Sequence, residues 1–322
     1  MIAHLQFTLT AEDEGQRLDV WLKRIVPSWS RGGIRSAIEE GRVRVGSYPV
    51  LRGCLLHTGD IVHLRHVPEP GDPPVTPDST LPLSVLYEDE TVVAVDKPAG
   101  LAVHPLRSGE APTLASALLA RYPEMAQACE DPLKPGLPDT LDTEASGIVL
   151  AARHADAFGA LRSQLQRHEI RRTYLAMVRG TVSRAGRAQG SIVQDPGRPG
   201  RMKVIAPDRK WRGEKAMRAT TSFRPLGSAK NYTLLEVIIR SNVLHQIRCH
   251  LAAGDLPIAG DALYGNAASP LPNRLLLHRS RMELVHPKTG QPLVLQCQPP
   301  SDWLALLRSL GIELAAPLNP PG

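Results

Sequence analysis

The chain has 322 residues, which is long enough for one large domain together with a small one. Hydrophobic residues make up 42% of the chain and charged residues 22%, a balance typical of a soluble globular protein and not of a disordered or fibrous one. The formal net charge of +6 permits a nucleic-acid partner without proving one.

The cysteines and the N-terminus exclude several further classes. The sequence Met1–His4 has no basic start or long apolar core, and no apolar run could span a bilayer, so we expect a cytoplasmic protein without a membrane partner. The four cysteines form no C-x-x-C pair, which argues against a disulfide scaffold or a zinc ribbon. His245 and His250 are five residues apart, not the four of a helical metal pair, so no metal is expected.

Residues 11–66 are predicted to begin with a short amphipathic helix. Leu18, Leu22 and Ile25 recur at helical spacing, and Pro27 would end the helix that they define. A small folded unit therefore opens the chain.

A second helix follows, with Ser30 as its predicted N-cap and Gly41 as its end. Its apolar positions are Ile34, Ala37 and Ile38. Two strands come next, Arg42–Val45 and Ile61–His66, because polar and apolar residues alternate in both.

This small unit is strongly basic. Between Arg17 and Arg52 there are eight Lys or Arg residues against three Asp or Glu residues. Cations gathered on one helix-and-strand surface suit an RNA phosphate backbone, and the alternative is a solvated basic face with no partner. The residues expected to contact RNA here are Arg17, Arg31, Arg35, Arg42 and Arg44.

The order of motifs in residues 15–66 resembles the S4 RNA-binding module. The resemblance implies a small α/β domain that binds RNA. The matching positions are Arg17-Leu18-Asp19, Ser30-Arg31, Ile34, Ile38, Gly41-Arg42-Val43, Val45 and Gly59-Asp60-Ile61-Val62.

Residues 67–80 contain five prolines and few apolar residues, which predicts a semi-rigid, extended linker. The linker divides the S4-like domain, residues 11–66, from a large domain, residues 81–312. The remaining residues, 313–322, are rich in proline and predicted to be disordered.

The large domain is predicted to contain more strands than helices. Its predicted strands are 83–87, 91–96, 148–152, 173–178, 232–239, 275–278 and 282–284. Its predicted helices are 114–119, 154–170, 245–254 and 303–310. Residues 198–218 carry eight basic residues against two acidic ones, which is typical of a flexible loop that contacts nucleic acid. We therefore predict an α+β fold with a mixed, mainly antiparallel sheet.

The most informative stretch of the large domain is Asp139–Gly147, which is dense in Asp, Thr, Ser and Gly and is therefore predicted to be a loop. The unbroken apolar run Ile148–Ala152 follows it and predicts a strand buried on both faces. Asp142 would then sit on a loop fixed by a buried strand, where reactive groups are commonly held. The alternative is a turn capped by acidic side chains.

The large domain resembles the RluA-type pseudouridine synthases. An S4-like module in front of the catalytic domain is also usual for one branch of that family. The matching motifs, in the order of the family, are Val95-Asp96-Lys97-Pro98-Ala99-Gly100, His104-Pro105, Leu141-Asp142, Ser146-Gly147, Tyr174-Leu175-Ala176, His245-Gln246-Ile247-Arg248, Gly260-Asp261, Tyr264-Gly265 and His286-Pro287.

The resemblance implies an enzyme that isomerises uridine to pseudouridine in structured RNA, with large-subunit ribosomal RNA the first expectation. It implies Asp142 as the nucleophile, Arg248 as the cation that keeps this acid ionised, and Tyr174 as the base that takes the proton from C5. By motif position, Lys97 and His245 are also expected to contact RNA. We expect no cofactor and no metal, and a monomeric protein.

Three short segments depart from the pattern of the family. Asp139-Thr140 replaces His-Arg, Ala145 replaces Thr, and Asn242-Val243-Leu244 replaces Gly-Arg-Thr. Two cations next to the site are therefore expected to be missing. Thr140 cannot contact RNA around the flipped base as an arginine would, which predicts a changed mode of base extrusion.

Two other functions are left open by these residues. The departures suggest a catalytically impaired RNA-binding or ribosome-assembly protein that retains the synthase fold. Glu144 beside Asp142 suggests the carboxylate pair of a glycoside hydrolase, but acids two residues apart on one loop rarely flank a bond.

Overall fold

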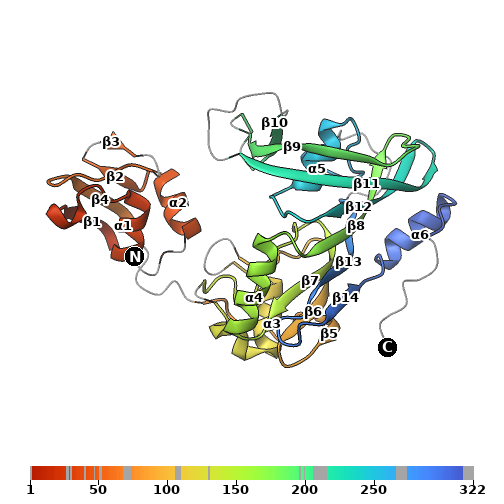
Figure 1. Cartoon of the computed structure of the whole chain (residues 1–322), viewed down its shortest axis with the longest axis horizontal. Coiled ribbons are helices and arrows are strands. Elements are labelled where there is room, and N and C mark those ends of the chain that lie inside the picture. The colour runs from red at the N-terminus through yellow and green to blue at the C-terminus, as the bar shows by residue number, and fades with distance from the viewer. Residues whose placement is uncertain are drawn as a thin grey trace. The chain divides into compact units, whose positions relative to one another are not determined.

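The computed structural model describes residues 2–26, 29, 31–39, 41–46, 48–50, 53–67, 74–105, 110–129, 131–195, 197–198, 200–205, 216–265 and 274–314. The chain forms two compact units, Met1–Pro74 and Val75–Gly322 (Figure 1). Among the described helices, none has the length and apolar character needed to cross a bilayer.

The small unit is a four-stranded antiparallel sheet with the strand order β1-β4-β2-β3, packed against two helices. Its elements are β1 (Ile2–Thr8), a 3-10 turn (Ala11–Asp13), α1 (Leu18–Ile25), α2 (Arg31–Glu39), β2 (Val43–Val45), β3 (Tyr48–Pro49) and β4 (Ile61–Val67). Leu18 and Leu22 of α1 and Ile34 of α2 lie in its core, as their spacing predicts. The predicted N-cap, Ser30, and the predicted stop, Pro27, lie outside the described residues.

Strand β1 was not predicted, because no element was assigned before residue 11. It pairs antiparallel with β4, from Ile2 opposite Val67 to Thr8 opposite Ile61. The polar and apolar residues of this segment do alternate, which is the pattern of a strand with one buried face. The small unit therefore includes residues ahead of its predicted start.

The large unit is built on a ten-stranded sheet with the order β10-β9-β11-β12-β8-β13-β7-β6-β5, and β14 pairs beside it with β13. Every pairing is antiparallel except the one between β13 and β7, so the predicted mixed, mainly antiparallel sheet is confirmed. The strands are β5 (Ser84–Glu88), β6 (Val92–Lys97), β7 (Ser146–Ala152), β8 (Arg171–Arg179), β9 (Gly186–Gln194), β10 (Met202–Ile205), β11 (Met217–Ala229), β12 (Tyr232–Ile239), β13 (Leu277–Val285) and β14 (Pro292–Gln296).

The helices cover both faces of this sheet. Alternate strand residues point to opposite faces, so Tyr174 and Leu175 of β8 belong to different cores. Helices α3 (Leu114–Arg121) and α5 (Gln246–Ala253) share the core of Tyr174 with the 3-10 turn Pro123–Gln127. Helices α4 (Ala155–Gln166) and α6 (Ser301–Ser309) pack on the other face. The face of α3 and α5 is the one that carries the candidate site.

Several predicted elements need correction. The two predicted late strands, 275–278 and 282–284, are one strand, β13, with a register shift between Arg279 and Arg281. Strands β9, β10, β11 and β14 were not predicted, and β10 and the start of β11 fall within the basic stretch 198–218. Residues 206–215 of that stretch lie outside the described residues, so the prediction of a flexible loop there stays a prediction.

The predicted linker and tail lie partly outside the described residues, which omit 68–73 and 315–322. From Val75 onward the chain belongs to the large unit: Val75 is buried in the core of α3, and its N–H donates to the carbonyl of Pro132 at 3.3 Å. The second half of the predicted linker is therefore anchored on the large unit.

Candidate active site

The loop that carries Asp142 is tied down at its backbone. The Ala145 N–H donates to the Asp142 carbonyl at 3.1 Å, and the carbonyl of Thr143 accepts from the Gly100 N–H at 2.8 Å. Strand β7 follows directly, and all seven of its residues are buried, as predicted for Ile148–Ala152. Asp142 is therefore held on a short, fixed loop at the start of a central strand.

Lys97 is a second anchor of this loop, and its placement does not support the predicted RNA contact. Its side chain is buried, and its ammonium donates to the carbonyls of Pro98, Leu101 and Thr143 at 2.8, 2.8 and 3.0 Å. These three bonds use all of its donors. Burial lowers the pKa of Lys97 to about 7, although Asp142 opposes that shift. Lys97 therefore supports the Asp142 loop from inside the domain.

Arg248, on α5, meets Asp142 as the motif predicts. Its Nε and Nη2 donate to the two carboxylate oxygens of Asp261 at 2.8 and 2.9 Å, and its Nη1 donates to Oδ2 of Asp142 at 3.0 Å. The side chain of Asp261 is fully buried, whereas that of Asp142 keeps 19% of its surface exposed. Asp261 thus fixes the orientation of the guanidinium, and Asp142 accepts a hydrogen bond from the remaining nitrogen, Nη1.

The charges of this cluster support one another. Burial alone would lower the pKa of Arg248, but Asp261 and Asp142 raise it above its ordinary value. The guanidinium of Arg248 thus forms a charge-assisted hydrogen bond with Asp142 at 3.0 Å. Glu144 lies farther away, with its carboxylate 3.7 Å from Arg248 Nη1, and is largely exposed.

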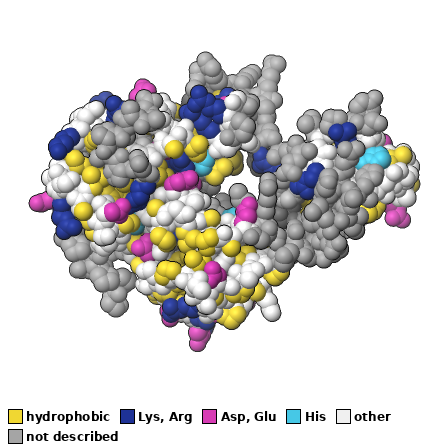
Figure 2. Space-filling view, turned by 180° about the vertical axis from the view of Figure 1, so that it is seen from behind, with side chains coloured by type: hydrophobic (Ala, Val, Ile, Leu, Met, Phe, Trp, Pro, Cys, Tyr) yellow, Lys and Arg dark blue, Asp and Glu magenta, His cyan; other side chains and the backbone are white. Residues whose placement is uncertain are grey.

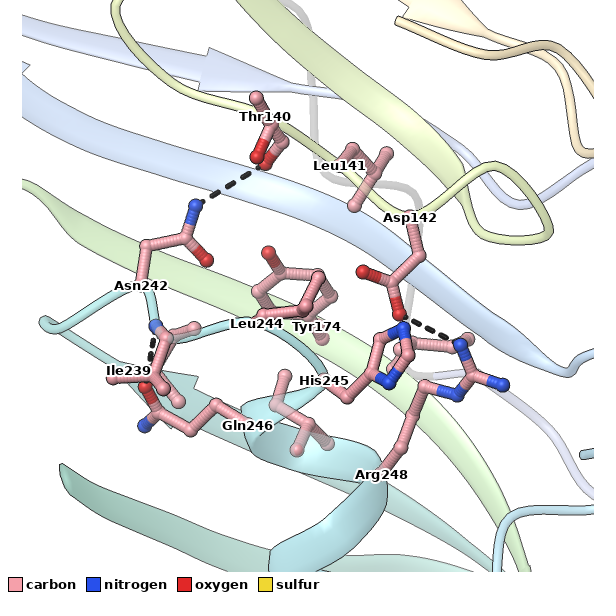
Figure 3. Close-up of a pocket in the computed structure, with 13 residues that line it drawn as sticks. Thr140, Leu141, Asp142, Tyr174, Ile239, Asn242, Leu244, His245, Gln246 and Arg248 are labelled. Atoms are coloured by element: carbon pink, nitrogen blue, oxygen red, sulfur yellow. Dashed lines mark hydrogen bonds and ion pairs between the residues drawn. The ribbon is translucent and has the colours of Figure 1, made fainter. Parts of the chain in front are cut away.

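The three predicted catalytic residues line one pocket of about 110 Å³ (Figure 3). Tyr174 of β8 lies between Asn242 and Asp142 in this view, and the Asp142 carboxylate points toward Arg248. The other lining residues come from the Asp142 loop, from the segment that leads into α5, and from β12 and β13: Thr140, Leu141, Ile239, Val243, Leu244, His245, Gln246, Ile247 and Leu277. Residues far apart in the sequence therefore meet around one small cavity.

His245 also lines this pocket. It is the N-cap of α5 and adopts a left-handed backbone conformation, with φ of 54°, which is uncommon for a residue other than glycine. The Tyr264 hydroxyl accepts from the Met202 N–H, so its own proton is free to bind His245 Nδ1 at 3.0 Å. Burial lowers the pKa of His245, which favours a neutral ring. The predicted contact between His245 and RNA stays a prediction.

The cations predicted to bind RNA in the small unit have different surroundings. Arg17 makes a double hydrogen bond with Asp19, at 3.0 and 2.9 Å, while remaining exposed. The guanidinium of Arg42 lies 5.9 Å from the centre of the Trp29 ring, and the Nε of Arg44 has no hydrogen-bond partner among the described residues. Arg35 is half-buried on α2, and the side chain of Arg31 lies outside the described residues.

A second group of charges lies beside the pocket and was not predicted. Arg172 and Arg279 are buried, and both donate to Oδ2 of Asp139 at 3.0 Å. Asn242 donates to the other oxygen of Asp139 and, at 3.2 Å, to the carbonyl of Thr140. These two guanidinium groups stand at other positions than the two cations predicted to be missing, which are replaced by Thr140 and Val243. Strand β13 combines apolar residues with His278, Arg279, Ser280, Arg281 and Glu283, so no pattern in the sequence marks Arg279 as buried.

The described residues contain no group of three or more His, Cys, Asp or Glu side chains arranged to hold a metal ion. The site consists instead of carboxylates paired with guanidinium groups around a phenol.

Comparison with known proteins identifies the family of each domain. The model of the RNA pseudouridylate synthase family matches residues 91–253, and that of the S4 domain matches residues 16–62. A structure titled Human RNA Pseudouridylate Synthase Domain Containing 4 aligns with a TM-score of 0.58 and 23% identity, over 72% of this chain and 95% of that chain. That likeness concerns the fold alone.

Curated relatives extend over nearly the whole chain. The ribosomal large subunit pseudouridine synthase D of Neisseria meningitidis serogroup B is 31% identical, over 95% of this chain and 82% of its own length. An uncharacterized RNA pseudouridine synthase of Chloroflexus aurantiacus is 35% identical, over 94% and 91%. The chain therefore belongs to the RluA-type pseudouridine synthase family, with an S4 domain ahead of its catalytic domain, and is an enzyme that isomerises uridine in RNA.

Proposed function

We propose that the pocket receives one uridine of large-subunit ribosomal RNA and that Asp142, Arg248 and Tyr174 carry out its isomerisation. The observation that carries the proposal is the hydrogen bond from Arg248 Nη1 to Asp142 Oδ2, in a pocket also lined by Tyr174. An ionised acid held by a fixed guanidinium is the group that attack at a sugar carbon requires.

Asp142 is the nucleophile in this proposal. Its carboxylate is partly exposed, so a substrate can reach it, while the guanidinium on its other side is buried. The C1′–N1 bond of the uridine breaks, the base turns, and a C1′–C5 bond forms. N1 gains a proton and C5 loses one, so the composition of the nucleotide does not change.

Tyr174 is the base that takes the C5 proton. Among the described residues that line the pocket, Tyr174 is the one that β8 contributes, and its phenol can accept and release a proton. The uracil must leave its stack to enter a cavity of this size, and Leu244, which is 57% exposed at the rim, is placed to contact the bases next to it.

Ribosomal RNA is the proposed substrate because relatives that match 95% of the chain are named ribosomal large subunit synthases. On the face shown in Figure 2, the Lys and Arg side chains of the described residues form separate groups, with Asp and Glu side chains among them. A groove of about 920 Å³ contains Arg187, Arg218 and Arg240 and shares Ile239 with the pocket. We assign RNA flanking the target uridine to this groove.

The catalytically impaired alternative rested on the lost Arg and Thr, whose places are taken by Thr140 and Ala145. Two neighbouring departures, Asp139 and Asn242, hydrogen-bond to each other beside a complete set of Asp142, Arg248 and Tyr174. The departures therefore indicate that the hydrogen bonds around the site have been rearranged, and not that activity has been lost. We favour the active enzyme.

The test replaces Asp142 by Asn and compares it with Glu144→Gln. Both changes remove one carboxylate from the same loop near Arg248, but only Asp142 lines the pocket. Release of tritium from RNA labelled at uridine C5 should fall below detection for Asp142→Asn and stay within about threefold of wild type for Glu144→Gln. RNA affinity should be unchanged in both. Substantial release by Asp142→Asn would refute the assignment.

A further inference from the structure

Arg279 is a buried guanidinium that touches both sides of the pocket. It stands opposite Tyr174 in the register between β13 and β8, and its side chain has no exposed surface. Its Nε donates to the Tyr174 hydroxyl oxygen at 2.8 Å. Its Nη2 donates to the carbonyl of Thr140, two residues before Asp142, also at 2.8 Å. One side chain therefore joins the proposed base to the loop of the proposed nucleophile.

Arg279 is itself fixed by buried partners. Its Nη1 donates to Asp139 at 3.0 Å and to the carbonyl of Ile148 at 3.2 Å, so every nitrogen of the guanidinium is engaged. Burial alone would raise the pKa of Asp139, but Arg172 and Arg279 hold it below its ordinary value. Asp139 is therefore a permanent anion that locks Arg279 in place.

The bond to Tyr174 can run in one direction only. A guanidinium has donors and no acceptor, so the phenol oxygen accepts from Arg279 and its own proton must point elsewhere. A fixed donor and a positive charge at that oxygen stabilise the phenolate relative to the phenol. Burial raises the pKa of Tyr174, and Arg279 opposes this rise. Without Arg279, the buried phenol would be a poorer proton acceptor at neutral pH.

We propose that Arg279, locked by Asp139, is a positioning residue that orients the Tyr174 oxygen in the pocket and favours the form that accepts the C5 proton. The inference rests on the proposed function, because it needs Tyr174 as the base. In this step the C5–H bond breaks, the proton goes to the phenolate oxygen, and the electron pair forms the C5–C6 double bond while the pair of the C6–N1 double bond moves to N1, which then takes up a proton from water. Arg279 keeps all of its protons and acts only through the tyrosine.

The test compares Arg279→Lys with Arg172→Lys. Both residues are buried and bind the same oxygen of Asp139, but Arg172 gives its other bond to the carbonyl of Arg240 and none to Tyr174. Each variant, in excess over the RNA, is mixed with RNA whose uridines carry hydrogen or deuterium at C5. The rate of pseudouridine formation is measured for both kinds of RNA. Arg279→Lys should be slower by about tenfold to a hundredfold, with RNA affinity within about twofold of wild type. Its deuterium isotope effect should rise, because C5 deprotonation becomes the slow step.

Arg172→Lys is the control for disturbing the buried hydrogen bonds around Asp139 without changing the bond to Tyr174. The isotope effect of this variant should equal that of wild type. The inference is overturned if Arg279→Lys keeps the wild-type rate, or if both variants are slowed equally with unchanged isotope effects. If Arg279→Lys does not fold, Arg279→Gln replaces it, because an amide still donates to the phenol while Asp139 retains Arg172; the same outcomes then apply.

The Tyr174→Phe variant separates this inference from the proposed function. If Tyr174→Phe keeps full activity, Tyr174 is not the base, and both the base assignment and the role of Arg279 are wrong. If Tyr174→Phe is inactive while Arg279→Lys is not slowed, only the role of Arg279 is wrong.

Discussion

Arg248 is held by both oxygens of Asp261 and has one terminal nitrogen left for Asp142. The Asp261 side chain has no exposed surface, so it depends on this guanidinium for charge compensation. A buried ion pair adds little net stability over apolar residues, yet removal of one partner is costly because the other charge is left alone in the interior. The stability of the fold and the proposed reaction are therefore both expected to depend on Arg248.

We predict that Arg248→Met lowers the free energy of unfolding by about 3–5 kcal/mol, because Asp261 is left as an uncompensated buried charge. Urea denaturation followed by circular dichroism measures this. The matched control is Arg224→Met, which breaks an equally bidentate but exposed pair with Glu236 and should cost at most about 1 kcal/mol. Equal losses in the two variants would mean that Arg248 does not carry the buried charge of the site.

Motifs in the sequence could predict Asp142, Tyr174 and Arg248, because each lies in a short pattern shared with the family. They could not predict Arg279 and Asp139, because a charged residue read alone is expected at the surface, and only the register of β13 with β8 brings Arg279 to Tyr174. Lys97 shows the opposite error: a cation in a family motif suggested RNA, whereas the fold uses it to hold backbone carbonyls.

Among the elements, the parallel pair β7–β13 matters most for the site, since it joins the strand after Asp142 to the strand of Arg279. The pairing sets His278 opposite Ser146 and Arg279 opposite Gly147, and Ser146 Oγ lies 3.0 Å from His278 Nδ1. Gly147 has φ of 112°, and a Cβ there would lie 2.3 Å from the Arg279 carbonyl oxygen. A glycine is therefore required for the two strands to approach.

We predict that Gly147→Ala lowers the free energy of unfolding by at least about 2 kcal/mol, because it adds both backbone strain and a clash with β13. The control is Gly159→Ala, an exposed position of α4 with no atom near the new methyl group, which should be stabilising by about 0.5–1 kcal/mol. Thermal unfolding of both variants tests whether the two changes in stability have opposite signs. A neutral Gly147→Ala would show that the strands can separate at no cost.

Sequence patterns found strands that are apolar on both sides, such as β7 and β12, and strands that alternate, such as β4, but failed for β1, β9, β10, β11 and β14. Strands β9 and β11 are rich in Arg, Thr, Ser and Gly, so it is their pairing with each other and with β12 that makes them strands. Strand β13 was predicted as two strands because the residues between them, 279–281, are polar, although Arg279 and Ser280 are buried and hydrogen-bonded.

At the scale of the whole molecule, the chain joins an S4 domain to a synthase domain, each with its own core. All the residues proposed for the chemistry lie in the large unit, so we expect the small unit to contribute affinity for RNA. Binding to a phosphate backbone releases counterions, and the dependence of affinity on salt therefore counts the phosphate groups that the protein neutralises. The predicted role of the small unit thus has a quantitative test.

We predict that the double reversal Arg31→Glu/Arg35→Glu weakens binding to a ribosomal RNA fragment and lowers the slope of log affinity against log salt by about 0.9 for each phosphate group that the protein no longer neutralises. Filter binding between low and physiological salt measures this slope. The control, Arg162→Glu/Arg308→Glu, makes the same change of charge at exposed positions of α4 and α6. A slope equal to that of wild type in the Arg31→Glu/Arg35→Glu variant would mean that α2 does not contact the RNA.

The central claim is that Asp142 makes this chain an enzyme acting on large-subunit ribosomal RNA. The most direct measurement maps pseudouridines in that RNA from a deletion strain carrying an empty vector, the wild-type gene, or the Asp142→Asn gene. We predict that at least one pseudouridine disappears on deletion, returns with the wild-type gene and stays absent with Asp142→Asn. An identical map in all three strains, or full restoration by Asp142→Asn, would contradict the claim.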